Sequence, residues 1–403
     1  MVLQKLKGVR IFVPFVNEGS KSTRPDKHIR ALLEAGATVE IVGQFPDWLV
    51  SRLSYFENVN FVRLDSLGRE FVSRNRIWLI RVFMNLTWNR LMRKLFPNLT
   101  LFEKLVKPGR HFRPHVVLCF NPPCLRIARS IAIKTRAKLI YDSGEFWPEY
   151  AKHPHWSEHP DLIRRHLNAE RDCIGDAALV VATSDEMRRR IKDHYRVRSC
   201  ITFFNSQADP TLERCIPAHN PVRFVFHGML GADRNLLNLI KAMRDITGAT
   251  LDIYGDFYSA EDGERLRKEL DENLKEKVVL HGSFTQEDIQ KFLPSYDVGI
   301  YPAVALDENF NITLPNKIFD CILSGLALAV PPFRSIEQII EVEKNGVIID
   351  TLSPKAMSRD LQQLVNAPMD ISRMKEASFG VASKYSRSAQ TAKLIAAYKE
   401  ALS

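Results

Sequence analysis

Short hydrophobic runs recur along the chain, and most are followed by a segment with helical periodicity. The runs are near-continuous stretches of Val, Ile, Leu and Phe, a pattern typical of strands that are covered on both faces. Strand–helix–strand repetition of this kind predicts parallel, doubly wound sheets. In the first half of the sequence the predicted strands are Val9–Val13, Thr38–Gly43, Val59–Leu64, His115–Phe120, Lys138–Tyr141, Ala178–Ala182 and Cys200–Phe204.

A second series of strands begins after the proline-containing stretch Asn205–Pro221. We therefore expect an α/β protein in which two Rossmann-like doubly wound domains, residues 1–209 and 210–380, face a cleft. Met374–Leu402 is helical in pattern, and we expect residues 381–403 to form a C-terminal helix able to pack back on the N-terminal domain. The predicted strands of the second series are Val222–His227, Thr250–Tyr254, Lys277–His281, Val298–Tyr301, Leu326–Val330 and Gly346–Ile349.

Glycines and a cation follow the strands of the second series, at the edge where sheets of this kind bind ligands. Gly228, Gly231 and Arg234 precede a predicted helix, which suits an anion because helix N-termini attract phosphate. Gly255 and Gly282-Ser283 follow the next two strands, where glycine lets a ring or phosphate approach the backbone closely. Ordinary turn geometry is an alternative explanation for each glycine taken alone.

The stretch Leu314–Ala327 combines signals for the start of a helix with side chains that could bind a ligand. Asn316 and Lys317 fall in the first turn of a predicted helix, and Asp320 follows three residues later on the same side. A cation at a helix N-terminus is unfavourable unless an anion is present. Lys317 suits binding to a diphosphate, and Asp320 suits binding to a ribose diol. The alternative explanation is a surface Lys–Asp ion pair without a ligand.

In the first half, acidic residues follow the strand Lys138–Tyr141. This segment brings the carboxylates of Asp142 and Glu145 near the aromatic ring of Trp147. Carboxylates can bind sugar hydroxyls or act in acid–base catalysis, and an aromatic ring can pack on the face of a sugar. A helix N-terminus that favours acidic residues explains the same pattern. The loop after the first strand holds Gly19 and Ser20, which are candidate contacts to an acceptor or a phosphate.

The stretch around Lys317 and Asp320 resembles a motif of a known protein family. The run LPNKIFDCILSGLALAV resembles the donor-site helix of retaining GT-B glycosyltransferases of the group 1, family 4-like type. In that family two glutamates stand eight positions apart; Asp320 matches the second, and Ile312 occupies the position of the first. RFVFHGMLGADRNLLNLIKAM is similar to the donor loop of the family, with Arg234 at a diphosphate-binding position.

The first half carries a matching segment. KLIYDSGEFWPEY resembles the aspartate-x-histidine-glutamate segment of the family, with Asp142 and Glu145 in place and Gly144 at the histidine position. ALVVATSDEM and TFFNS then follow in the order that the family shows. In the second half, TLDIYGD and KVVLHGSFTQEDIQKFLPSYDVGIYPA match the strands that come after the donor loop of the family.

The resemblance implies a metal-independent hexosyltransferase that moves a sugar from a nucleotide-sugar to a glycan or lipid-linked acceptor with retention. No cofactor is implied beyond the nucleotide-sugar co-substrate. The expected catalytic residues are Asp142, Glu145, Arg234 and Lys317. The expected donor-binding residues are Gly228, Gly231, Arg234, Gly255, Gly282, Ser283, Asn316, Lys317 and Asp320, and the expected acceptor-binding residues are Gly19, Ser20, Glu145 and Trp147.

Two other functions remain open. A sugar-nucleotide epimerase of the same fold needs no acceptor. A catalytically degenerate binding subunit is suggested by Ile312 and Gly144. Histidines at positions 153, 155, 159 and 166 raise the question of a metal site, but Pro154 and Pro160 interrupt the helical spacing that zinc ligands use, so we expect a polar loop and no metal.

Charge narrows the expected location and partners. The 403-residue chain carries a net charge of +10, of which residues 69–113 alone contribute +9. Hydrophobic residues between 77 and 95 recur at helical spacing within this segment, which is typical of a helix lying on an anionic membrane. A crossover helix with a solvated basic face is the alternative, and nucleic acid is disfavoured because no nucleic-acid-binding motif accompanies the charge. No signal peptide or transmembrane pattern is present, and the scattered cysteines suit a reducing cytosol, so we expect a cytoplasmic protein, peripheral at the inner face of the membrane.

Overall fold

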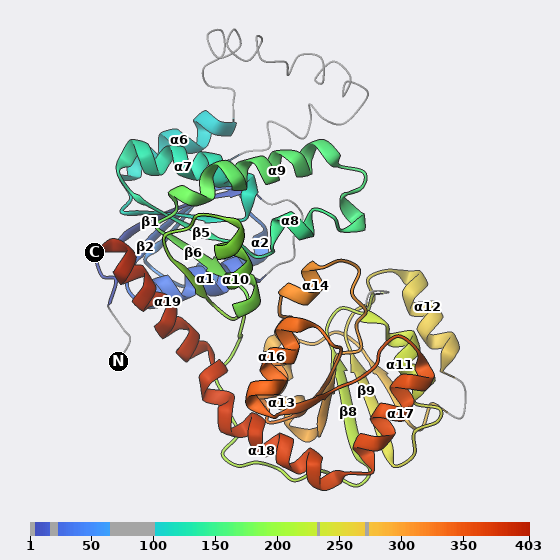
Figure 1. Ribbon diagram of the computed structural model, residues 1–403. Helices are drawn as coiled ribbons and strands as arrows, with labels where there is room; N and C mark the ends of the chain where they lie inside the picture. Colours follow the sequence, from blue (N-terminus) through green and yellow to red (C-terminus); the bar gives the residue numbers. More distant parts are fainter. Residues whose placement is uncertain (1–4, 17–22, 65–100, 232–233, 271–273) are drawn as a thin grey trace.

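The computed structural model describes residues 5–16, 23–64, 101–231, 234–270 and 274–403, and these form two bodies, each built on a parallel sheet (Figure 1). The first sheet has the strand order β3-β2-β1-β4-β5-β6-β7. This order places the crossover between β1 and β4, as in Rossmann-like sheets. The strands are β1 (Arg10–Val16), β2 (Thr38–Gln44), β3 (Val59–Arg63), β4 (Val116–Phe120), β5 (Lys138–Asp142), β6 (Leu179–Ala182) and β7 (Cys200–Thr202).

The second sheet repeats the same topology with six strands, in the order β10-β9-β8-β11-β12-β13. The two sheets confirm the predicted α/β fold with doubly wound domains. Its strands are β8 (Val222–His227), β9 (Ala249–Tyr254), β10 (Val278–His281), β11 (Val298–Ile300), β12 (Ala327–Val330) and β13 (Gly346–Ile348).

Helices cover both sheets, so that the apolar strands are buried on both faces. In the N-terminal half the α-helices are α1 (Arg24–Glu34), α2 (Asp47–Leu53), α6 (Leu101–Phe112), α7 (Leu125–Thr135), α8 (Trp147–Tyr150), α9 (Pro160–Cys173) and α10 (Asp185–His194). In the C-terminal half they are α11 (Leu236–Ala242), α12 (Ala260–Glu269), α13 (Gln286–Phe292), α14 (Asn309–Ile312), α15 (Asn316–Leu323), α16 (Arg334–Glu343) and α17 (Pro354–Val365).

The C-terminal segment forms two helices rather than the single expected run. α18 (Pro368–Tyr385) packs on α15 and β12 of the C-terminal half, and α19 (Arg387–Leu402) crosses to α1 and β6 of the N-terminal half (Figure 1). The chain turns at Ser386, whose backbone is extended and whose side chain caps α19 by accepting a hydrogen bond from the Ala389 N–H. Leu394, Ile395 and Tyr398 of α19 belong to the apolar core of the N-terminal half.

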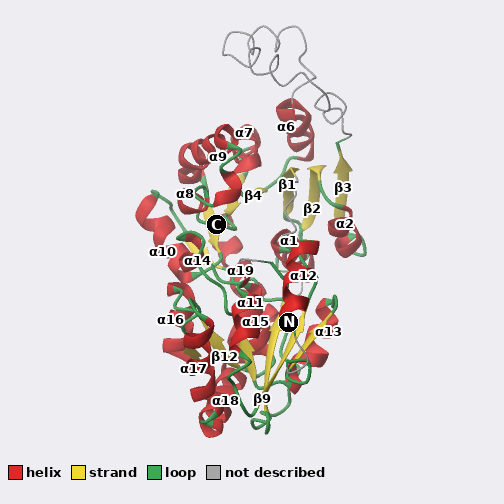
Figure 2. Cartoon of the chain, turned by 90° about the vertical axis from the view of Figure 1, so that its right-hand side faces the viewer, coloured by secondary structure: helices red, strands yellow, loops and turns green. Residues whose placement is uncertain are grey.

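The carboxyl ends of the two sheets face one another. Residues that follow β5, β6 and β7 form hydrogen bonds with the stretch from β11 to the start of α15: Glu145 with Asn309, Ser184 with the carbonyl of Ile312, and Asn205 with Asn316. A view turned by 90° shows the two sheets in separate bodies (Figure 2). Any ligand held between the bodies therefore lies against the residues that follow the strands.

Several expectations concern residues outside the described ranges. Gly19 and Ser20 lie outside them, as does the predicted helical stripe between residues 77 and 95. Among the helices that the structure describes, none is long and apolar enough to cross a membrane. Five of the six cysteines are buried and the sixth, Cys215, is half-buried.

Candidate active site

Two glycine turns at the ends of β8 and β9 interlock at the edge of the C-terminal sheet. The N–H of Gly228 donates to the carbonyl of Tyr254, and the N–H of Gly255 donates to the carbonyl of Gly282. Gly228 and Gly255 have φ angles of +126° and +149°, a region that favours glycine. A Cβ atom on Gly255 would lie 1.9 Å from the carbonyl oxygen of Gly228. These two glycines are therefore required by the backbone itself, whereas Gly282 has open space around its Cα.

Two cations converge beside the glycine turns. The ammonium group of Lys317, in the first turn of α15, lies 3.9 Å from the centre of the Phe226 ring and 5.1 Å from that of Tyr301. Arg234 donates from Nη1 to the Tyr301 hydroxyl at 3.3 Å. Lys317 also reaches over Gly228, where a Cβ would lie 3.1 Å from Nζ. The site thus presents positive charge at the N-terminus of a helix, which suits a diphosphate.

Asp320 lies one turn further along α15 and is only 4% exposed. Its Oδ2 accepts a hydrogen bond from Nε2 of His227 at 3.2 Å. His227 is the last residue of β8, so the sheet fixes the direction of the Asp320 carboxylate. Asn316, at the start of the same helix, accepts a hydrogen bond from the amide of Asn205. Gly231 and the exposed Ser283 lie in the loops after β8 and β10, at the same edge of the sheet.

Lys27 joins this group from the N-terminal half. Its ammonium donates to the carbonyl and to the side-chain oxygen of Asn205, at 2.9 and 2.7 Å. Burial lowers the pKa of Lys27 to about 7, and the charge of Asp320 opposes that shift. Sequence reasoning missed Lys27. The available sign in the sequence is the charge-rich run Arg24–His28 at the start of α1. The structure buries this run throughout.

Asp142 lies in a buried polar network rather than at the surface of the cleft. Arg24 Nε donates to Oδ1 at 2.6 Å, and His28 Nδ1 donates to Oδ2 at 2.5 Å. Nε2 of His28 forms a hydrogen bond with the Tyr398 hydroxyl of α19 at 2.7 Å, and burial lowers the pKa of His28. Burial alone would raise the pKa of Asp142, but the charge of Arg24 and the bond from His28 outweigh it and lower the pKa. Both carboxylate oxygens of Asp142 therefore accept hydrogen bonds from α1, one from Arg24 and one from His28.

Glu145 has a different environment, although it lies only three residues away. Asn309 Nδ2 donates to its Oε2 at 2.7 Å, and among the described residues no hydrogen bond occupies Oε1. Burial raises the pKa of Glu145 to about 7, against the effect of the Asn309 hydrogen bond and with a contribution from the charge of Asp307. A carboxyl group with a pKa near neutrality is suited to proton transfer.

Trp147 is buried in the turn that follows Glu145. The ring is 3% exposed and packs edge-on against Tyr150 and His166, at centroid distances of 5.4 and 5.2 Å. The indole supports the 146–150 turn from behind, and a sugar ring has no access to its face. Gly144 allows close packing of the same turn, since its N–H donates to Oδ1 of Asn121 at 2.9 Å.

A pocket of about 440 Å³ opens next to this turn, between the two halves. Its lining is polar and includes three arginines, which pair with Glu186 or Glu308, and two carboxylates. In the described part of the chain, no three His, Cys, Asp or Glu side chains group together as a metal site requires. The pocket is lined by Phe146, Pro148, Glu149, Arg189, Arg190, Asp193, His194 and Arg334.

The half of the chain that carries the two cations matches a known family. Residues 221–367 match the family model described as glycosyl transferases group 1. No curated protein gives a significant match to the chain.

Solved structures resemble nearly the whole chain at low sequence identity. HepE from Anabaena in complex with UDP has a TM-score of 0.71 and 14% identity, covering 97% of this chain and 100% of that one. Sucrose-phosphate synthase from Thermosynechococcus elongatus has a TM-score of 0.67 and 11% identity, with coverages of 97% and 98%. A TarM mutant from S. aureus, in complex with fondaparinux, alpha-GlcNAc-glycerol and UDP, has a TM-score of 0.61 and 11% identity, with coverages of 98% and 99%. The fold is therefore GT-B, as the sequence predicted.

Proposed function

We propose that the protein is a glycosyltransferase that binds a nucleotide-sugar on its C-terminal half and transfers the sugar to an acceptor held by its N-terminal half. The observation that carries this proposal is the convergence of Arg234 and Lys317 beside the Gly228 turn, in the half that matches the group 1 family model. The complexes of HepE and of TarM with UDP support a nucleotide-sugar as the donor.

In the proposed reaction the bond between the anomeric carbon and the diphosphate breaks while a bond to an acceptor hydroxyl oxygen forms. Lys317 and Arg234 stabilise the negative charge that develops on the leaving diphosphate. The hydroxyl proton passes to Glu145, whose pKa of about 7 keeps a sizeable fraction of the carboxylate available at neutral pH. We further propose that the configuration at the anomeric carbon is retained, that a hexose is transferred and that no metal takes part.

We assign the expected donor-binding residues to the ribose, the base and the diphosphate of a nucleotide-sugar. Asp320, held by His227, is placed to accept from the ribose hydroxyls, and the backbone at Gly282 and Ser283 leaves room for the base. Gly228, Gly231 and Gly255 let the diphosphate approach the loops after β8 and β9 closely, with Asn316 beside it. Asp142 then acts as a positioning residue, because it holds Arg24 and His28 in α1 beneath the cleft.

A thermal-shift screen with UDP-, GDP-, ADP- and CMP-sugars tests donor binding. We expect one nucleotide class to raise the melting temperature, because a ligand at 100 times its Kd stabilises the folded state by about 2.7 kcal/mol. The free nucleoside diphosphate of the same base is expected to retain most of the shift. If no nucleotide-sugar and no nucleoside diphosphate raises the melting temperature, the donor site is wrong and the protein is better explained as a degenerate GT-B binding subunit.

We also propose that the acceptor is a glycan or a lipid-linked glycan in cell-surface polysaccharide or glycolipid synthesis, that it enters through the pocket beside Phe146, and that the protein works in the cytoplasm at the membrane surface. The charge of +9 in residues 69–113 supports this location. We expect sedimentation with vesicles containing anionic lipid at low salt, reversal at 0.5 M salt, and no sedimentation with neutral vesicles. Replacement of Arg90, Arg93 and Lys94 by Gln is expected to weaken the binding. A protein that stays in the supernatant with anionic vesicles contradicts the membrane proposal only.

A further inference from the structure

The short helix α14 belongs to the C-terminal half but is anchored in the N-terminal half. Ile312 is completely buried and is part of the apolar core formed by N-terminal residues such as Ala182, Met187 and Ile191. The carbonyl oxygen of Ile312 accepts hydrogen bonds from the hydroxyl groups of Ser184 and Ser335, one from each half. The residue at the position of the first acidic residue of the donor motif therefore makes a contact between the halves and does not face the donor.

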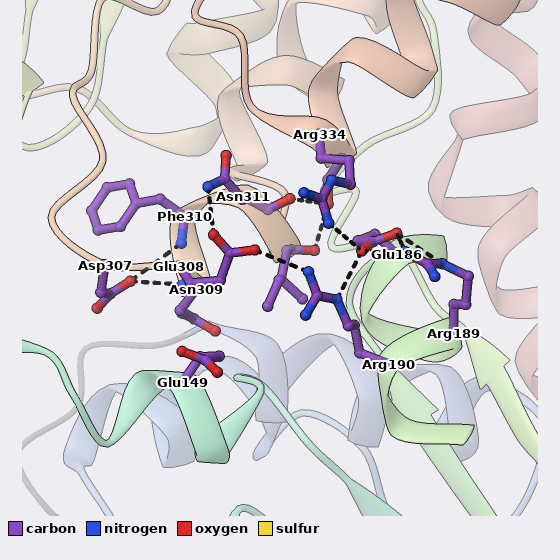
Figure 3. A network of polar contacts seen from close by, with 12 residues as sticks. Glu149, Glu186, Arg189, Arg190, Asp307, Glu308, Asn309, Phe310, Asn311 and Arg334 are labelled. Atoms are coloured by element: carbon purple, nitrogen blue, oxygen red, sulfur yellow. Dashed lines mark hydrogen bonds and ion pairs between the residues drawn. The ribbon is translucent and has the colours of Figure 1, made fainter. Parts of the chain in front are cut away.

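Ion pairs flank this contact on the outer side (Figure 3). Arg190 of α10 reaches across to Glu308 at 2.9 Å, and Arg334 of α16 reaches back to the buried Glu186 at 3.4 Å. Glu308 also accepts a hydrogen bond from the side chain of Asn311. Glu308 is thus committed to the contact between the halves and is not free to replace the missing acidic residue of the donor motif.

Asn309 connects α14 directly to the turn that carries Glu145. Its Nδ2 donates to Oε2 of Glu145 at 2.7 Å, and its Oδ1 accepts from the Phe146 N–H at 3.1 Å. Asn309 is 5% exposed, so the two hydrogen bonds are shielded from water. One amide therefore fixes both the backbone and the carboxylate of the turn.

The charges around Glu145 come from several elements. The charge of Asp307, in the loop before α14, raises the pKa of Glu145. The charge of Arg24 in α1 lowers it. Burial raises the pKa of Tyr150 of α8, and the charges of Glu145 and Asp307 add to this shift. Asn309 is the side chain that directly bonds the charged form of Glu145, whereas Asp307 opposes that form.

We propose that Asn309 is a positioning residue for Glu145, so that the C-terminal half orients the carboxylate that the N-terminal half presents to the acceptor hydroxyl. The inference rests on the proposed function, because it assumes that Glu145 receives the acceptor proton. Glu145 has its working orientation only when the two halves are in contact through α14. Contact between the two halves around the donor and the orientation of Glu145 for proton transfer are therefore coupled through the side chain of Asn309.

The test compares Asn309→Ala with Asn311→Ala, a matched control in the same helix whose amide bonds Glu308 instead of Glu145. Asn309→Asp provides a second variant, nearly isosteric, that keeps the acceptor for the Phe146 N–H and removes the donor to Glu145. For each variant we would record kcat, donor KM, the pH profile of transfer, and the Glu145 carboxyl titration by ¹³C NMR, assigned by its loss in Glu145→Gln.

We expect Asn309→Ala to lower kcat about 10- to 100-fold, the range typical of losing a hydrogen bond to a charged group, with little change in donor KM. Because that hydrogen bond favours the carboxylate, its loss raises the pKa of Glu145 above about 7, so the acidic limb of the pH profile moves to higher pH. Asn309→Asp is expected to shift the limb in the same direction, and Asn311→Ala to leave it in place. Adding Asn309→Ala to Glu145→Gln is expected to cost little further activity.

Two failures can be told apart. If the wild type transfers sugar but Asn309→Ala behaves like Asn311→Ala in kcat and in the Glu145 titration, the positioning role is wrong and the proposed function stands. If the wild type neither binds nor turns over any nucleotide-sugar, the proposed function fails and this inference fails with it.

Discussion

Lys317→Ala is expected to lower the rate of sugar transfer about 10²- to 10³-fold, with a smaller change in donor KM. The ammonium group lies between the Phe226 and Tyr301 rings and above Gly228, so it is held in place before any donor binds. Preorganised charge at the position of a leaving group stabilises the transition state more than the ground state, and its removal typically costs this much. The measurement is the steady-state rate of nucleoside diphosphate release at saturating donor.

Lys291→Ala is the matched control for this prediction. Lys291 is in the same half, on α13, and its side chain is 75% exposed and pairs with Asp288 at the surface. We expect its removal to leave the rate unchanged. A Lys317→Ala variant as active as Lys291→Ala would show that Lys317 does not stabilise the leaving group.

Gly255→Ala is expected to give the largest loss of stability among single substitutions at the site, on the order of 3 kcal/mol or more. The new Cβ would lie 1.9 Å from the carbonyl oxygen of Gly228, and the φ of +149° is unfavourable for any residue with a side chain. The turns after β8 and β9 would have to separate, which also displaces Lys317 from its place above Gly228. Thermal melting of the purified variant is the measurement.

Gly282→Ala controls for adding a methyl group at the same edge of the sheet. Nothing lies within 4 Å of the position that its Cβ would take, so the change in stability is expected to stay within about 0.5 kcal/mol. If the two alanine variants melt at the same temperature, the interlocked turns do not stabilise the C-terminal half.

The strands and the parallel, doubly wound class of both sheets could be predicted because each strand is a continuous apolar run. The break between α18 and α19 could not be predicted from periodicity. A helical pattern continues across Ser386, and the turn depends on where the two halves lie. The anchoring of Ile312 was equally hidden, since an isoleucine in a loop carries no sign of which core it enters.

The donor side of the candidate site was more accessible to sequence reasoning than the acceptor side. The sheet positions the glycines that follow its strands and the starts of the helices that come next. The structure accordingly brings Gly228, Arg234 and Lys317 together. The role of Asp142 depends on His28 and Tyr398, which are 114 and 256 residues away in the sequence. Contacts at such separations are set by packing of the whole chain, which no local motif encodes.

The most direct test of the central claim is to incubate the protein with the nucleotide-sugar that protects it thermally and to follow both products. We predict release of nucleoside diphosphate that is slow with donor alone and faster with a glycan or lipid-linked acceptor. We expect Lys317→Ala to lower both this release and the transfer about 10²- to 10³-fold, and Lys291→Ala to leave them unchanged. Conversion of the donor into an isomeric nucleotide-sugar without release of nucleoside diphosphate would contradict the account and identify an epimerase. No reaction of any donor, with or without acceptor, would contradict a catalytic role altogether.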